Sequence, residues 1–284
     1  MNIPKVFKEY PAQFRLMFVG MLISTMGASM IWPFMMIYAS SKLDLPLTAI
    51  ASLLTIQAAA GLISTSLAGP VIDRLGRKWM MVFSLLTNGV VYLFLSHAND
   101  YQTFAILMSF SGAVNPIYRV GSDAMLADLI PEEKRVDGYA LLRLSNNLGI
   151  ALGPAIGGWL AATSYDLAFL GATIGMSTYS LLLAVFARET LPQKEQSITA
   201  KPEKETFGGY PEILRDRPFM KFIGAFILVS MCATLIWTLL GVYAKTNYQL
   251  SERQYGFLPT TNAFMVVTLQ LWITSHTKRY PILP

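Results

Sequence analysis

The sequence of 284 residues is poor in the side chains that catalytic and metal sites use most. It holds one cysteine, Cys232, and two histidines, His97 and His276. A single cysteine excludes an internal disulfide and any zinc or iron–sulfur site built on cysteines. No glycine-rich string ending in Gly-Lys-Ser or Gly-Lys-Thr occurs, which argues against ATP as an energy source. The sequence therefore predicts no cofactor, no metal site and no enzyme.

Charge is also scarce, whereas apolar residues are abundant. Charged residues make up 14% of the chain and apolar residues 54%, against about 25% and about 45–50% in soluble domains. The net charge of +5 could suggest a nucleic-acid partner, but a membrane topology accounts for it better, so we expect none. A membrane-spanning helix needs about 20 apolar residues. Eight such runs are present, at 13–40, 46–69, 79–97, 102–129, 137–162, 165–187, 219–244 and 253–274.

These runs predict an all-α, polytopic membrane protein in two unequal parts. The first six runs predict a six-helix N-terminal bundle over residues 1–187. The connection at 188–218 is long and rich in proline, glycine, lysine and glutamate, so it is expected to be a cytoplasmic linker. Residues 219–284 would then form the first two helices of a second bundle.

The distribution of basic residues predicts the orientation. Most of the 22 lysines and arginines fall in the tails and the even-numbered connections. Lys42, Lys245 and Arg253 fall on the opposite side, and Arg119 lies inside a predicted span. Because cytoplasmic loops carry the excess of lysine and arginine, the N-terminus is expected to be cytoplasmic. The protein is expected in the plasma (inner) membrane.

A charged loop follows the second run. Its functional candidates are Gly69, Asp73, Arg74, Gly76, Arg77 and Lys78. Gly76 is expected to supply a backbone shape that other residues resist. Asp73 could pair with a cation or face a helix N-terminus, and Asp128, at the end of the fourth run, is expected to pair with Arg77 or Arg74. A plain basic anchoring loop is the simpler interpretation. The spacing nevertheless resembles the loop between helices two and three of the major facilitator superfamily.

The fifth run contains a string of small residues, which are Gly149, Gly153, Pro154, Gly157 and Gly158. Glycines four residues apart form a stripe that lets a neighbouring helix approach closely. Pro154 removes one backbone donor and favours a kink. Helix packing alone would explain the stripe. The string also resembles the helix-five motif of antiporters in the same superfamily, with Ala140 where that motif has a further glycine.

The resemblance implies a drug/proton antiporter-like exporter with two six-helix halves. Members of the superfamily usually have twelve helices, so a chain with eight is expected to be truncated after helix eight. One feature departs from the pattern. Exporters of this group often carry an arginine in helix four, and the matching position here is Met108. This departure weakens the transfer of that arginine's role to this chain.

Ionisable residues inside the membrane are costly, and they are therefore functional candidates. Arg119 and Asp123 lie one helical turn apart on the fourth run. Arg143 lies at a similar expected depth on the fifth run, which suggests a cluster of the three. A static polar clamp between the two helices, proton coupling through Asp123, and contact with an anionic substrate are the three interpretations of this cluster.

Other polar and aromatic side chains are candidates for a substrate cavity. They are Trp32, Tyr38, Asn115, Asn146 and Asn147. The two adjacent asparagines could face a central cavity or bond neighbouring helices, and the sequence does not favour either role. Aromatic residues in a membrane helix can also be ordinary core or lipid-facing positions.

The predicted function is proton-coupled efflux of a drug-like or metabolite molecule by alternating access. Its partners would be a small-molecule substrate, protons and the lipid bilayer, without nucleic acid or ATP. A uniporter or symporter for a metabolite in the same fold is one alternative. A non-transporting receptor or fragment is the other.

Overall fold

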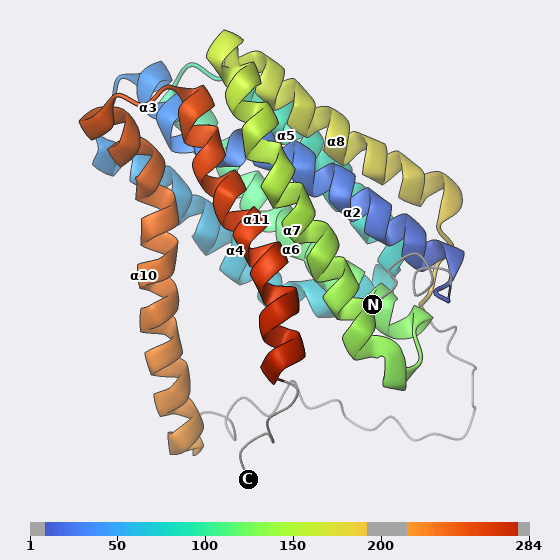
Figure 1. Ribbon diagram of the computed structural model, residues 1–284. Helices are drawn as coiled ribbons and strands as arrows, with labels where there is room; N and C mark the ends of the chain where they lie inside the picture. The colour runs from blue at the N-terminus through green and yellow to red at the C-terminus, as the bar shows by residue number, and fades with distance from the viewer. Residues whose placement is uncertain (1–8, 192–214, 278–284) are drawn as a thin grey trace.

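The computed structural model describes residues 9–191 and 215–277, and every regular element in these ranges is a helix (Figure 1). This confirms the all-α prediction. Most of the predicted linker, residues 192–214, lies outside the described part of the chain. The elements are α2 (Ala12–Ile31), η1 (Trp32–Phe34), α3 (Met35–Leu43), α4 (Leu47–Leu75), α5 (Arg77–His97), α6 (Tyr101–Leu129), α7 (Glu132–Thr163), α8 (Tyr165–Phe186), α10 (Arg217–Tyr248) and α11 (Glu252–Thr277).

Three elements differ from the predicted runs. The first predicted helix is broken by the 3₁₀ turn η1, because Pro33 cannot donate a backbone hydrogen bond. The second helix continues past the end of its apolar run to Leu75, so most of the charged loop motif is helical. α7 begins five residues earlier than predicted. Its first turn carries Glu132 and Glu133, whose negative charges suit the positive end of the helix dipole.

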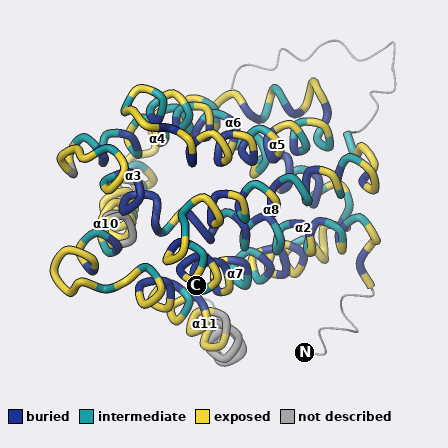
Figure 2. The backbone as a smooth tube through the Cα atoms, turned by 90° about the horizontal axis from the view of Figure 1, so that it is seen from above, coloured by how far each residue is buried: buried dark blue, intermediate teal, exposed yellow. Residues whose placement is uncertain are grey.

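The helices of the first part lie side by side in an order that differs from their order in the chain. Moving across the bundle, the packed pairs are α4 with α6, α6 with α5, α5 with α8, α8 with α2, and α2 with α7 (Figure 2). α11 packs against α7 at the edge of this arrangement. α10 contacts mainly α3, η1 and α11, and it stands away from the other helices in Figure 1.

Buried apolar residues form two clusters, one toward each end of the bundle. One surrounds the broken helix and contains Phe34, Tyr38 and Phe169. The other lies where α2 begins and contains Phe14 and Tyr179. Since lipid is as apolar as these side chains, tight packing rather than escape from water holds such helices together.

Five segments of the described chain are long and apolar enough to cross a membrane. They are Ala12–Leu43, Thr48–Leu75, Arg77–His97, Tyr165–Phe186 and Arg217–Tyr248. α6, α7 and α11 do not meet this test of length and composition, although each packs against at least one of the other five. That these three also cross the membrane stays a prediction from the apolar runs and the distribution of basic residues.

Candidate functional site

Gly76 alone connects α4 to α5. Its φ of +96° and ψ of 147° lie in a backbone region that is essentially restricted to glycine. Its amide donates to the carbonyl oxygen of Ile72 at 3.0 Å, which completes the last turn of α4. The sequence prediction for Gly76 is confirmed, because the chain reverses direction between two long helices at this one residue. We refer to the end of the bundle that holds this connection as the Arg77 end.

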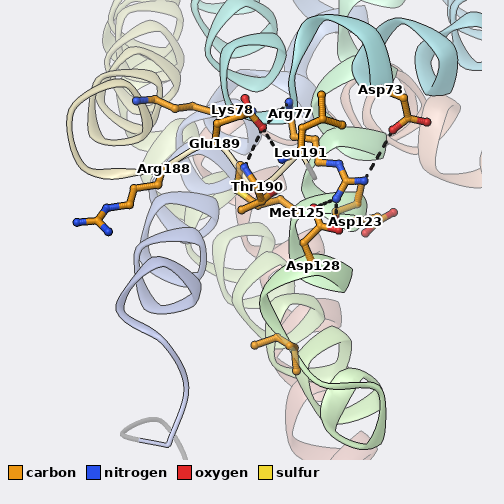
Figure 3. Close-up of polar contacts among 12 residues, drawn as sticks. Asp73, Arg77, Lys78, Asp123, Met125, Asp128, Arg188, Glu189, Thr190 and Leu191 are labelled. Carbon is orange, nitrogen blue, oxygen red and sulfur yellow. Dashed lines mark hydrogen bonds and ion pairs between the residues drawn. The ribbon is translucent and has the colours of Figure 1, made fainter. Parts of the chain in front are cut away.

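Arg77 is the centre of a polar network at this end (Figure 3). Its guanidinium group forms an ion pair with Asp128 at the end of α6 and lies 3.8 Å from Asp73 Oδ1 on α4. Arg77 Nη1 also donates to the carbonyl oxygen of Ala124 at 3.1 Å. The Arg77 side chain is only 12% exposed. Asp128 was predicted to pair with Arg77 or Arg74, and in the structure it pairs with Arg77.

Glu189, just after α8, completes this network. Its two carboxylate oxygens accept hydrogen bonds from the backbone amides of Arg77 at 2.9 Å and Lys78 at 3.0 Å. These amides are unpaired donors at the positive end of α5, where a carboxylate is favourable. Asp73 was one candidate for this role, but it faces Arg77 instead, and Glu189 takes the helix N-terminus. No local motif marks Glu189, so the sequence analysis missed it.

A second contact fixes the exit of α8 beside Glu189. The amide side chain of Gln13, at the start of α2, donates to the carbonyl oxygen of Arg188 at 2.8 Å and accepts from the Arg188 backbone amide at 3.0 Å. The segment that leaves the first six helices is therefore held by Gln13 on one side and by the α5 amides on the other.

The predicted cluster of intramembrane charges does not form ion pairs. Within the described residues, no ion pair of 4.0 Å or less joins any two of Arg119, Asp123 and Arg143, and all three are exposed. The prediction of a paired cluster is wrong. Arg119 and Asp123 lie one turn apart on α6, but their charged atoms do not approach within 4.0 Å. Arg143 is on α7, which packs mainly on α2, α8 and α11, whereas α6 packs mainly on α4 and α5. One bond near Asp123 does join the two helices: Tyr139 Oη donates to the carbonyl oxygen of Asp123 at 3.1 Å.

The glycine stripe of α7 faces the first helix. A Cβ atom at Gly157 would lie 2.0 Å from the carbonyl oxygen of Met30, and one at Gly153 would lie 2.6 Å from that of Met26. A Cβ atom at Gly149 would lie 2.9 Å from the Met26 amide nitrogen. The prediction that this stripe allows close helix approach is confirmed, and the neighbour is α2.

The other small residues of this string face α11. A Cβ atom at Gly158 would lie 2.6 Å from the carbonyl oxygen of Glu252. In the reverse direction, a Cβ atom at Gly256 would lie 2.4 Å from the carbonyl oxygen of Pro154. α7 thus packs closely on the first part of the chain along one face and on α11 along another.

A second polar network lies near this contact. It is at the beginning of α8, whereas the Arg77 network is at the end of α8. We call it the Glu252 end. The Glu252 carboxylate accepts hydrogen bonds from Lys245 Nζ at 2.7 Å and from Tyr165 Oη at 2.9 Å. The guanidinium carbon of Arg253 lies 3.5 Å from the ring centroid of Trp159. These contacts join α10 and α11 to the ends of α7 and α8. No motif in the sequence marks any of these five residues as functional.

The predicted cavity residues separate into different environments. Tyr38 is only 4% exposed, and its hydroxyl donates to the carbonyl oxygen of Ser96 at 2.9 Å, so its assignment to a substrate cavity is wrong. Asn146 Oδ1 accepts from Thr25 Oγ1 at 3.1 Å, which makes it a bond between helices. Asn147 is half-buried and Asn115 is exposed. Trp32 is 53% exposed and borders a cavity described below.

Comparison with known proteins gives consistent results. The family model described as the Major Facilitator Superfamily matches residues 17–284. A "Na(+), Li(+), K(+)/H(+) antiporter" of Planococcus maritimus is 25% identical, with 96% of this chain and 70% of that protein aligned. A class H tetracycline resistance protein of Pasteurella multocida is 26% identical over 67% of this chain. This chain spans about half the length of that relative, at 48%.

The fold is shared with solved transporter structures. The human organic anion transporter MFSD10 (TETRAN) superposes with a TM-score of 0.64 at 18% identity, covering 92% of this chain and 72% of that one. At this identity the likeness concerns the fold alone.

Proposed function

Since this chain belongs to the major facilitator superfamily, we propose that it works as a secondary active transporter that exports small molecules in exchange for protons. The superfamily consists of transporters, and the chain is not an enzyme. Proton entry would supply about 2.3 kcal/mol per charge per 100 mV of membrane potential. The charge distribution supports a plasma (inner) membrane location, with the N-terminus and the Arg77 end at the cytoplasmic face.

The observation that carries this proposal is the uneven contact of α10 with the rest of the chain. Near the Glu252 end, Ala244 is buried, and a Cβ atom at Gly241 would lie 3.1 Å from the Tyr255 ring. Toward the Arg77 end, none of the described residues 215–234 is buried, and a Cβ atom at Gly224 would meet nothing within 4 Å. A bundle joined at one end and separated at the other is the arrangement that alternating access requires.

The two polar networks would act as gates in this cycle. We assign Gly69, Asp73, Arg74, Gly76, Arg77, Lys78 and Asp128 to the cytoplasmic gate. The Asp73 side chain is 63% exposed, which leaves it available for a partner when α10 approaches. The Glu252 network would hold the opposite end closed in the conformation described above.

Asp123 is the proposed proton carrier. Arg119 lies one helical turn before it on α6, and Arg143, the third charge of the predicted cluster, is on α7. Asp123 is exposed on α6, six residues before the end of that helix, so the described residues do not enclose its carboxylate. An Asp123→Asn variant should bind substrate but lose proton exchange. Asp44→Asn is the matched control, because Asp44 is an exposed aspartate at the end of α3, in a left-handed conformation that asparagine also tolerates.

The test is proton movement in proteoliposomes that hold a pH gradient and a pH-sensitive dye. Ethidium and tetracycline probe organic efflux, and Na⁺, Li⁺ and K⁺ probe the cation exchange for which one relative is named. We expect an organic compound to discharge the gradient with wild-type and Asp44→Asn protein, but not with Asp123→Asn. If only the cations discharge the gradient, the protein exchanges cations for protons and does not export drugs. Substrate flux without proton movement would favour a uniporter, and absence of any flux would overturn the proposal.

A further inference from the structure

A cavity of about 180 Å³ lies beside the break in the first helix. Four elements of the first part border it, namely the broken helix, α4, α5 and α6, and Thr234 of α10 also contributes. It is therefore built mainly into the first six helices, with α10 on one side.

The lining of this cavity is mostly apolar and carries no charge. Met36 and Met108 supply flexible thioether side chains, and Trp32 and Tyr92 supply aromatic surface. No acidic or basic side chain of the described residues lines it. A charged ligand would lose its hydration here without gaining a counter-ion, so the lining favours an uncharged ligand.

A hydrogen-bond chain gives the cavity one oriented polar group. Ser111 Oγ donates to Asn88 Oδ1 at 2.9 Å and accepts from Gln57 Nε2 at 3.3 Å. Asn88 is in turn held by the Ser84 carbonyl oxygen at 3.1 Å. Ser111 and Asn88 are each 3% exposed, so this chain is fixed inside the bundle.

Gln57 lines the cavity and retains unused hydrogen-bonding capacity. Its side-chain amide has two N–H donors and one carbonyl acceptor, and the bond to Ser111 uses a single donor. Within residues 9–191 and 215–277, no hydrogen bond to its carbonyl oxygen or from its second N–H is present. One donor and one acceptor on the same planar group match a ligand that has the complementary pair, such as a carboxamide.

We propose that this cavity binds a small, uncharged ring compound with one amide-like group, which hydrogen-bonds to Gln57. The volume of the cavity limits the ligand to about one ring, because an apolar cavity of about 150 Å³ accommodates benzene. A drug-sized molecule, which needs about 300 Å³ or more, would place only one ring in it. As a statement about the transported substrate class, the inference rests on the proposed function, whereas binding itself does not require transport.

The test uses benzamide and its charged analogues. Purified full-chain protein in detergent is titrated with benzamide, benzoate and benzamidine by equilibrium dialysis, with empty micelles subtracted. Benzamide should bind saturably at one site, and at least tenfold more tightly than either ion. Equal binding of the three compounds, or no saturable benzamide binding, would overturn the proposal.

Variants of Gln57 locate the site. Gln57→Leu should weaken benzamide binding about tenfold, whereas Gln102→Leu should leave it unchanged, because Gln102 is exposed and does not line the cavity. Gln57→Glu keeps the side-chain shape, so it should shift the preference from benzamide to benzamidine even if Gln57→Leu fails to fold. Wild-type preference in Gln57→Glu would contradict the assignment. Since dialysis needs no proton gradient, its outcome is independent of the transport assay.

Discussion

Arg77 connects three helices through one guanidinium group. It begins α5, pairs with Asp128 of α6 and lies near Asp73 of α4. A guanidinium group has five N–H donors in a fixed plane, so it can serve two carboxylates and the Ala124 carbonyl oxygen together. A lysine ammonium would not reproduce this geometry. The neighbouring Arg74 is exposed and forms no ion pair within the described residues.

This contrast predicts different effects of two similar substitutions. Arg77→Ala would leave Asp128 unpaired, so it should lower the free energy of unfolding by about 1–3 kcal/mol, less than the loss of a fully buried pair. Arg74→Ala should change it by less than about 0.5 kcal/mol. Thermal unfolding in detergent, followed by tryptophan fluorescence, measures both. If the two variants have the same melting temperature, the Arg77 network does not contribute measurably to the free energy of unfolding.

The backbone at Gly76 makes a second prediction at this scale. Gly76→Ala should cost about 1–3 kcal/mol, because alanine resists this backbone region and its Cβ would lie 2.6 Å from Glu189 Oε2. Gly69→Ala is the control, since a Cβ there meets nothing within 4 Å and alanine favours a helix interior. We expect the melting temperature to fall for Gly76→Ala only. A fall for both would mean that any added methyl group disturbs this region.

Among the elements, α7 has two packing faces with different partners. Gly149, Gly153 and Gly157 contact α2, which belongs to the same six helices, whereas Gly158 contacts α11. One short string of small residues therefore serves both the internal packing of the first part and its junction with the second. Packing of the first kind is expected to matter for stability, and packing of the second kind for the relative movement of the two parts.

The stripe can be tested with one methyl group. Gly157→Ala would place a Cβ 2.0 Å from the carbonyl oxygen of Met30 and would force α7 away from α2, at a cost of about 1–3 kcal/mol. Gly224→Ala on α10 adds the same group in open space, so it should be neutral or slightly stabilising. Chemical unfolding in mixed micelles compares the two. An unchanged unfolding midpoint for Gly157→Ala would contradict this packing.

At the scale of the whole molecule, α8 lies between the two polar networks. Tyr165, in its first turn, bonds to Glu252, and Glu189, three residues after its end, caps α5. Its 22 residues extend about 33 Å, close to the thickness of the hydrocarbon core. One helix therefore contacts both proposed gates, and under the proposed function we expect its position relative to α11 to differ between the closed and open states of the Glu252 end.

A double-mutant cycle tests this contact. Tyr165→Phe and Glu252→Gln should show a coupling energy of about 0.5–1.5 kcal/mol in unfolding, because each removes the same hydrogen bond. Tyr165→Phe with Glu133→Gln should be additive, since Glu133 lies in the first turn of α7, away from this network. Additivity in both cycles would show that Tyr165 and Glu252 do not interact in the membrane protein.

The sequence by itself determined the features that depend on local composition and spacing. Long apolar runs predicted the helices within a few residues, and the loop pattern predicted the special backbone of Gly76 and the ion pair of Asp128 with an arginine. The glycine spacing predicted close helix approach. The helices, the Gly76 backbone and the glycine stripe follow from the neighbours of each residue along the chain. The ion pair of Asp128 was expected for another reason, namely that Asp128 and the charged loop were both placed at the cytoplasmic ends of predicted helices.

Only the tertiary structure decided which helix faces meet. Matched depth suggested that Asp123 and Arg143 would lie in one cluster, but their helices pack mainly on different partners. Tyr38 was a candidate for the cavity, yet its hydroxyl donates a hydrogen bond to a backbone carbonyl oxygen at the end of α5. Glu189 gained its role because α8 returns to the start of α5. Apolar helices resemble one another in composition, so the choice of neighbours depends on three-dimensional packing that spacing along the chain does not encode.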